Sequence, residues 1–397
     1  MKYFDFKDYK KSFPKKKQLN KQKALITSSI LIIVVLFIVI FSIYISNSSF
    51  REFLDTYILR KNIYQENVVS IDISNDDNQS IFAYDKYICT LNKNILKTYS
   101  SSGKEDFEFD VSINNPVYDT NNRFLALAEK NGSKLCLISG QNVIWQKDIE
   151  GQISLIKINK NGYISVVVKG TSYKAIVITY NPQGKELFKT YLSTTNAIDI
   201  AISNDNKYLS IAEIDSSGSI IQSNIKIISI EKAQNDPTNA VEYIYPATSN
   251  DIIIKIKYQD KNKLVCFYDT SIHVIHDNNN TKLIDILDKK DIFADIHLEN
   301  YVVKAQENSL GLFANTDFQI ININNQKENI YTLSGIPKTI YTYEDTIAIV
   351  LGTEIHFIDQ NGWLIKKYYS TQEIKEVVVG SAIAGVIYKD KIEIINI

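Results

Sequence analysis

The sequence contains few of the residues from which metal sites and disulfide frameworks are built. Its 397 residues include three cysteines and four histidines. Cys89, Cys136 and Cys266 lie far apart, each inside an apolar run, and there is neither a C-x-x-C pair nor a Cys/His cluster. Three cysteines cannot all pair with one another. We therefore expect buried free thiols, and neither a structural zinc site nor a disulfide scaffold.

The common catalytic and cofactor motifs are also missing. No G-x-S-x-G, P-loop, G-x-G-x-x-G or H-E-x-x-H pattern occurs. His273 and His276 are three residues apart, and on a strand this spacing directs them to opposite faces, which argues against a shared metal. The carboxylate-rich stretch 72–78 lacks the glycine and the distal glutamate of a calcium loop. The sequence therefore predicts no catalytic residue, no metal ligand and no cofactor.

A large net charge is absent, but the charges are distributed unevenly. The net charge of −1 combines +7 over residues 1–23, where nine lysines face only Asp5 and Asp8, with −8 over the remainder. A mildly acidic domain is a poor electrostatic partner for nucleic acid or other anionic polymers. The bias toward lysine, isoleucine and asparagine suggests an AT-rich bacterial genome.

One long apolar run is present. Ala24 to Ser46 are 23 residues without a charge, and a helix of that length reaches about 34 Å, enough to cross the hydrocarbon core of a bilayer. The run is longer than the apolar part of a signal peptide, and neither an Ala-x-Ala-like cleavage site nor a lipoprotein cysteine follows it. We therefore predict an uncleaved, single-pass transmembrane helix over residues 24–46.

The flanks of this run predict its orientation. The lysine-rich residues 1–23 should stay in the cytoplasm, and the rest of the chain should lie outside the plasma membrane of a bacterium. Residues 47–66 then form a juxtamembrane stalk, and residues 67–397 an extracytoplasmic domain. Part of the stalk has the apolar period of one helix face, at Phe50, Phe53, Leu54, Tyr57 and Ile58.

Two kinds of β-hairpin recur along residues 67–397. The first is a strand, a polar turn and a strand, at 116–129, 155–170, 199–214 and 255–269. The second follows at 97–109, 177–191 and 356–368, with a looser copy at 137–149. Gly103, Gly184 and Gly362 stand where its tight turn needs a positive φ. Two hairpins make a four-strand unit, which is the pattern of β-propeller blades.

The number of units predicts an all-β propeller of eight blades. Unit starts fall near residues 79, 116, 154, 197, 252, 293, 338 and 374. The last unit has only three strands, and the segment 68–74 is a strand without a unit. We expect this segment to complete the last blade and close the ring, which covers edges that an open ring would expose. Seven blades is the alternative, if the weak unit at 79–110 merges with the N-terminal strand.

The sequence resembles two groups of proteins. Turns such as NPQGKELF (181–188) resemble the repeat of quinoprotein-like propellers, although the quinone-binding and metal-ligand residues have no counterpart here. The chain has two tryptophans and no WD dipeptide, so it is not a standard WD-repeat protein. The tail, the span, FREFLDTYILRKNIYQEN (50–67), SNDNKYLSIAE, YQDKNKLVCFYD, NGWLIKKY and the terminal YKDKIEIINI resemble clostridial, hence Gram-positive, proteins of the domain of unknown function 5711. That resemblance implies the topology and a propeller-like fold, and no activity.

A propeller without catalytic motifs predicts a binding or scaffolding module of the cell envelope. Two loops between second and third strands are enlarged, at 214–223 and 306–317. The second carries Leu310, Leu312 and Phe313, our candidate contact for a protein partner, unless these residues pack over the neighbouring blade. The alternative is an extracytoplasmic hydrolase, lyase or oxidoreductase that uses the central channel. It requires carboxylates or histidines that converge at one mouth of the ring.

Overall fold

The structure is a computed structural model. It describes residues 21–47, 50, 51, 54, 58, 68–73, 79–92, 94–248, 251–260, 263–286, 291–308 and 314–397. The chain divides into two compact units, residues 1–59 and residues 60–397, and each is described by itself.

The first unit contains one long helix, α2 (Lys21–Ser46). Its segment Ser28–Ser46 is long and apolar enough to cross a membrane. Beyond the helix, the Arg51 guanidinium donates to the carbonyls of Tyr44 (3.0 Å) and Ile45 (2.8 Å), which satisfies acceptors that have no partner within the helix. Of the predicted helical face at 50–58, Phe50, Leu54 and Ile58 are helical, and Phe53 and Tyr57 lie outside the described residues.

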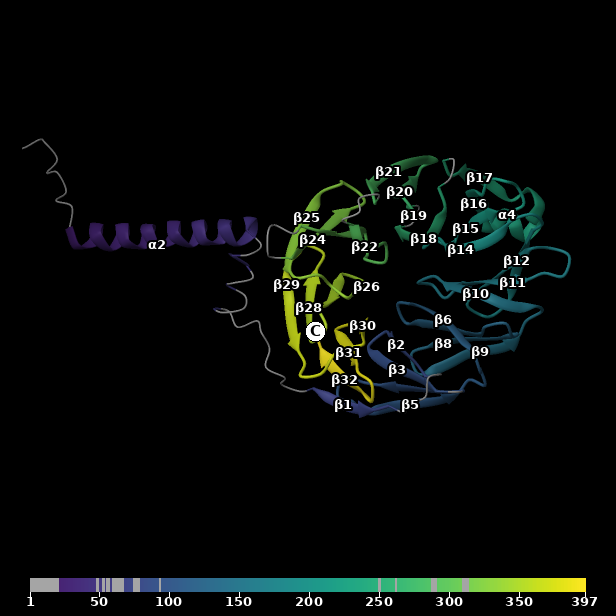
Figure 1. The fold of residues 1–397 in the computed structure, drawn as a ribbon, viewed down its shortest axis with the longest axis horizontal. Coiled ribbons are helices and arrows are strands. Elements are labelled where there is room, and N and C mark those ends of the chain that lie inside the picture. Colours follow the sequence, from purple (N-terminus) through teal and green to yellow (C-terminus); the bar gives the residue numbers. More distant parts are fainter. Residues whose placement is uncertain are drawn as a thin grey trace, which may run out of the picture. The chain divides into compact units, whose positions relative to one another are not determined.

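The second unit is an eight-bladed β-propeller of four-stranded antiparallel sheets (Figure 1). The strands of the first four blades are β2 (Ser80–Tyr84), β3 (Tyr87–Asn92), β4 (Ile95–Tyr99) and β5 (Glu105–Asp110); β6 (Pro116–Asn121), β7 (Phe124–Glu129), β8 (Lys134–Ser139) and β9 (Asn142–Asp148); β10 (Gln152–Ile158), β11 (Ile164–Lys169), β12 (Ala175–Tyr180) and β13 (Glu186–Leu192); and β14 (Asn196–Ile202), β15 (Tyr208–Asp215), β16 (Gln222–Ser229) and β17 (Val241–Pro246).

The remaining blades have the same order. Their strands are β18 (Ile253–Asp260), β19 (Lys263–Tyr268), β20 (Ser271–His276) and β21 (Asn279–Asp285); β22 (Asp291–Asp295), β23 (Tyr301–Glu307), β24 (Asn315–Asn322) and β25 (Glu328–Ser334); β26 (Thr339–Tyr343), β27 (Thr346–Val350), β28 (Glu354–Asp359) and β29 (Leu364–Tyr369); and β30 (Glu376–Gly380), β31 (Ile383–Ile387), β32 (Lys391–Asn396) and β1 (Val69–Asp72). The predicted fold and the predicted blade starts are confirmed.

The ring closes through its first strand. β1 pairs antiparallel with β32, so that Val69 lies opposite Ile394 and Ile71 opposite Ile392. The last blade therefore combines the two ends of the propeller sequence, and Figure 1 shows β1 beside β32. The predicted closing strand is confirmed, and the seven-blade alternative is wrong because β2–β5 form a separate sheet.

The local sequence explains the turns. Gly103, Gly184 and Gly362 have φ of +72°, +77° and +73°, as predicted. Gly184 is also required by space, because a Cβ there would lie 2.9 Å from the ring of Trp145 in the preceding blade. One element was not predicted. The short helix α4 (Ile230–Asn235) lies between β16 and β17, begins at an N-cap formed by Ser229, and buries its Ile230.

Apolar side chains fill the interfaces between neighbouring blades. One cluster joins residues of β7 and β8 to residues of β10–β12, and another joins β27–β29 to β30–β32. Cys89, Cys136 and Cys266 are fully buried within the blades and unpaired, which confirms the prediction of buried free thiols. Burial raises the pKa of each thiol, so all three are poor nucleophiles.

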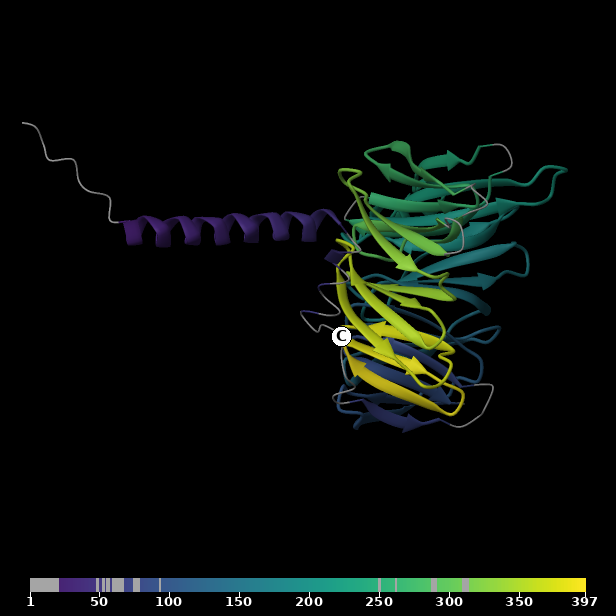
Figure 2. The ribbon, with the colours of Figure 1, turned by 60° about the vertical axis from the view of Figure 1, so that its left-hand side comes forward.

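The antiparallel order gives the ring two different sides. We call one the turn side, because it carries the turns between first and second strands and between third and fourth strands. We call the other the loop side, because it carries the second-to-third-strand loops and the connections between blades. Figure 2 shows the ring tilted, with connections at both ends of the strands. Both enlarged loops of the sequence analysis belong to the loop side.

We expect the closing strand to contribute to stability through Ile71, whose side chain packs in a cluster with Ile392 and Ile394. Ile71→Lys should lower the free energy of unfolding by about 1–3 kcal/mol, because it removes the apolar contacts that hold β1 against the last blade. Urea unfolding of the detergent-solubilised full chain measures this. The matched control is Ser70→Lys at the adjacent exposed position. Equal effects of the two substitutions would contradict the role of β1.

Candidate functional site

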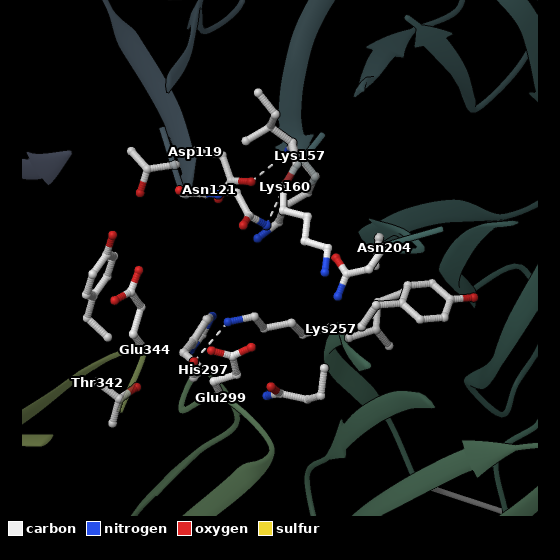
Figure 3. Close-up of a pocket in the computed structure, with 18 of the residues that line it drawn as sticks. Asp119, Asn121, Lys157, Lys160, Asn204, Lys257, His297, Glu299, Thr342 and Glu344 are labelled. Atoms are coloured by element: carbon white, nitrogen blue, oxygen red, sulfur yellow. Dashed lines mark hydrogen bonds between the residues drawn. The ribbon is translucent and has the colours of Figure 1, made fainter. Parts of the chain in front are cut away.

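A cavity of about 480 Å³ lies in the central channel, lined by the innermost strands of six blades and the turns that follow them. Its walls are mostly polar (Figure 3). The labelled lining residues are Asp119, Asn121, Lys157, Lys160, Asn204, Lys257, His297, Glu299, Thr342 and Glu344. Because Lys160, Asn204, Glu299 and Glu344 belong to turns between first and second strands, the cavity reaches the turn side of the ring.

Three buried or half-buried carboxylates join neighbouring blades across the channel wall. Asp119 of β6 accepts from the backbone N–H of Ile158 in the next blade at 2.8 Å. Asp199 of β14 accepts from that of Ile256 at 2.9 Å. Asp295 of β22 accepts from the Thr342 hydroxyl of β26. Each bond satisfies a polar group in the innermost layer, so these carboxylates hold adjacent blades together.

Lys157 neutralises two of these carboxylates. Its Nζ lies 3.6 Å from Asp199, and the charge of Asp119 followed by that of Asp199 raises the pKa of Lys157. Burial in turn raises the pKa of Asp199, against the opposing effect of Lys157. The three side chains form a compact ion network between the second, third and fourth blades.

Asp295 also orients His297. His297 Nδ1 lies 2.9 Å from Asp295 Oδ2, and the His297 backbone N–H donates to Oδ1 at 2.6 Å. Burial pushes the pKa of Asp295 upward, but the hydrogen bonds and charge of His297 and the Thr342 hydroxyl outweigh it, and the pKa lies well below its usual range. A carboxylate-oriented imidazole is able to accept a proton. The turn side therefore brings a histidine and carboxylates together, as the enzyme alternative requires.

Lys257 has a different environment from Lys157. Its Nζ donates to the His297 carbonyl at 2.9 Å. Within the part of the chain that the structure describes, no carboxylate oxygen lies within 4.0 Å of this ammonium group. Burial lowers the pKa of Lys257. The charges of Asp295, Asp119 and Glu299 oppose this effect, so carboxylates of other blades partly compensate the half-buried ammonium group.

Two glutamates share the cavity with these lysines. Glu299 and Glu344 line the cavity, and both also line a second hollow beside it with Asn300, Asp345 and Gln360. Burial, followed by the charges of Asp345 and Glu299, raises the pKa of Glu344. The cavity therefore contains charges of both signs, and Glu299 of the sixth blade acts on Lys257 of the neighbouring fifth blade.

The predicted partner contact, Leu310, Leu312 and Phe313, lies outside the described residues. It falls between β23 and β24, the second and third strands of one blade. The other enlarged loop is described, and it exposes Ile220 (56%) and Ile221 (46%).

The sequence analysis missed every residue of the channel. These residues come from six hairpins spread over residues 118–344, and only the ring brings them together. One signal was available in the sequence. Asp119, Lys157, Asp199, Lys257 and Asp295 are charged residues within or at the end of strands that are otherwise apolar or half-buried.

We predict that Asp295 makes stability depend on pH. Because its pKa is lower in the folded state, its contribution is complete above about pH 5 and is lost as the pH falls toward the folded value. Asp295→Asn should therefore lower stability at pH 7 by about 1–3 kcal/mol, and the difference from the parent should narrow below about pH 4. Unfolding curves from pH 3 to 7 measure this, with the exposed Asp106→Asn as control. A gap that stays constant with pH would contradict the assignment.

Comparisons with solved structures find the same architecture at low identity. BamB from Moraxella catarrhalis is 10% identical with a TM-score of 0.50, over 84% of this chain and 99% of that one. Dihydro-heme d1 dehydrogenase NirN is 11% identical with a TM-score of 0.48, over 77% of this chain and 74% of that one. The Cps50 (Swd1) β-propeller domain of Myceliophteria thermophila is 9% identical with a TM-score of 0.46, over 77% and 100%. The similarity to BamB shows a shared fold and nothing about function. We draw no conclusion from the other two structures.

None of the curated proteins matches the sequence. A family model does, over residues 59–397, which covers the whole of the propeller unit. The match agrees with the resemblance found in the sequence, and the chain belongs to the family of unknown function DUF5711.

Proposed function

We propose that this protein is a membrane-anchored β-propeller that binds a protein partner at the surface of a bacterial cell. In this proposal residues 24–46 cross the plasma membrane once, residues 1–23 are cytoplasmic, residues 47–66 are the stalk, and residues 67–397 are extracytoplasmic. The apolar helix α2 and the lysine excess before it support the anchor and its direction. The closing strand β1 begins at Val69, soon after α2 ends at Ser46, so the chain tethers the ring at its eighth blade.

One observation carries the binding role. The loop between β15 and β16 exposes two adjacent isoleucines, Ile220 and Ile221, at a polar tip of serines and glycine. Next to it lies the loop between β11 and β12, since the charge of Lys174 acts on Asp215. That neighbouring loop exposes Tyr173 (39%). An exposed apolar group on enlarged loops, surrounded by polar residues, suits contact with another protein.

We favour binding over catalysis because of the second role of Asp295. Its carboxylate orients His297 and also holds Thr342 of the next blade. The bond to Thr342 gives the carboxylate a structural role between the sixth and seventh blades that needs no reaction. The Asp295 carboxylate is therefore explained by the architecture of the ring.

The proposed topology predicts a labelling pattern. The buried native cysteines should react slowly, so single introduced cysteines report their own location. Gly218→Cys, in the exposed loop after β15, should react with a membrane-impermeant maleimide on intact cells. Lys10→Cys should react only after the cells are permeabilised. The reverse pattern would contradict the orientation, and the parent chain is the background control.

The proposed partner surface predicts a change in cross-linking. Replacement of residues 308–314 by a Gly/Ser loop, combined with Ile220→Ser and Ile221→Ser, should remove the main partner from an in-cell cross-linking pull-down. Loss of apolar contact at an interface centre usually costs about 1–4 kcal/mol of binding. The control is Ile330→Ser, which changes a similarly exposed isoleucine (48%) on the outer strand β25. An unchanged partner list would argue against this surface.

A further inference from the structure

The charged residues of the turn side are distributed unevenly around the ring. In the turns of the first three blades, the described residues include five cations and one carboxylate, that of Asp85. The cations are Lys86, Lys104, Arg123, Lys160 and Lys185. All of them are exposed, and within the described residues none has a carboxylate oxygen within 4.0 Å. This half of the turn side is therefore basic.

Two carboxylates begin strands directly after these turns, and both are paired within their own blades. Glu105 of β5 lies 3.1 Å from the ammonium group of Lys97. Glu186 of β13 lies 3.7 Å from that of Lys189. Neither carboxylate therefore pairs with the exposed cations of the neighbouring turns, which are left to the solvent or to another molecule.

The turns of the fifth, sixth and seventh blades have the opposite charge. Their charged residues, as far as the structure describes these turns, are Asp277, Glu299, Lys327, Glu344 and Asp345, all exposed. Glu299, Glu344 and Asp345 line one hollow together. Glu299 also acts on Lys257 in the channel, whereas the charge of Asp345 raises the pKa of Glu344 after burial does. A cation that entered this hollow from outside would relieve that repulsion.

The fourth and eighth blades separate the two halves of the turn side (Figure 1). Two copies can therefore place their turn sides face to face about a two-fold axis that runs from the eighth blade to the fourth. This axis puts the first, second and third blades of one copy opposite the seventh, sixth and fifth of the other. Opposite charges then meet at three places: Lys86 with Glu344 and Asp345, Arg123 with Glu299, and Lys185 with Asp277. Lys327 faces the uncharged turn 140–141. The face is thus self-complementary, as a two-fold interface requires.

We propose that the turn side binds the turn side of a second copy of this chain, as a two-fold dimer. The point at which the chain enters the ring agrees with this axis. β1 begins on the turn side of the eighth blade, where the Val69 side chain occupies the space that a Cβ of Gly103 would need. The two copies therefore enter their rings beside the axis.

This part of the inference rests on the proposed membrane anchor. Exposed ion pairs are individually weak, but two chains anchored in one membrane meet at a high effective concentration. Several weak pairs with a matching pattern then suffice to select one orientation. The loop side stays free, so the dimer and the proposed partner surface are compatible.

Native mass spectrometry of the detergent-solubilised full chain tests the dimer with two charge variants. Lys86→Glu with Arg123→Glu makes the basic half acidic, and Glu299→Lys with Glu344→Lys makes the acidic half basic. The parent should dimerise, and each variant alone should dimerise at least about 10-fold more weakly, because like charges then face each other. An equimolar mixture of the two variants should associate again, as a heterodimer.

The matched control is Lys130→Glu with Lys169→Glu, which reverses two exposed lysines on the loop side of the second and third blades. It changes the net charge as the first variant does, and it should dimerise like the parent. A monomeric parent, or a mixture of the two turn-side variants that stays monomeric, would overturn the proposal. So would a monomeric parent that binds phosphatidylglycerol vesicles through Lys86 and Arg123, since lipid would then be the occupant.

Cross-linking in membranes tests the axis. Ser381→Cys, an exposed position in the turn after β30 of the eighth blade, should form disulfide-linked dimers on mild oxidation. Gly218→Cys on the loop side should not. Equal cross-linking of the two variants, or none of Ser381→Cys, would contradict the interface. If the labelling of Gly218→Cys on intact cells followed the proposed topology while Ser381→Cys failed to cross-link, the dimer would be wrong and the anchored propeller would stand.

Discussion

The pairing of β1 with β32 is the constraint on which the rest of the structure depends. Seven blades are each built from one continuous stretch of sequence, and their order around the axis follows the chain. The eighth exists only when Val69–Asp72 joins the last three strands. Without it, β32 would present an unpaired edge. The facing blade walls, the channel and the cavity all require a closed circle, and this short antiparallel ladder closes it.

The innermost layer is held together by polar contacts between blades. Eight strands meet around the axis, where apolar side chains alone would leave backbone groups unsatisfied. Carboxylates at Asp119, Asp199 and Asp295 solve this by bonding to the next blade. The same layer carries Lys257, whose ammonium group donates to the His297 carbonyl of the next blade. Charged groups of both signs therefore join neighbouring blades in this layer.

The sequence predicted the blades well because each is a local pattern. Alternation, polar turns and three glycines indicated the hairpins, and the spare strand at 68–74 indicated the closure. The channel could not be predicted in this way. The bulges at Ala197/Asp199 and Ile253/Lys255 interrupt the alternation of side chains between the two faces of β14 and β18. A strict two-residue alternation therefore assigns Asp199 and Lys257 to the wrong face of their strands. Helix α4 was missed because it has only six residues.

The position of β1 also has a mechanical consequence. Any pull between an anchored N-terminus and a partner held by the propeller passes through β1 before it reaches the remaining strands. The load then rests on the ladder of four facing residue pairs from Val69↔Ile394 to Asp72↔Lys391, because no covalent bond joins β1 to β32. If that ladder opened under tension, the eighth blade would lose a strand while the other seven sheets kept theirs. The closing strand is thus the point at which force applied to the anchor would first be felt by the ring.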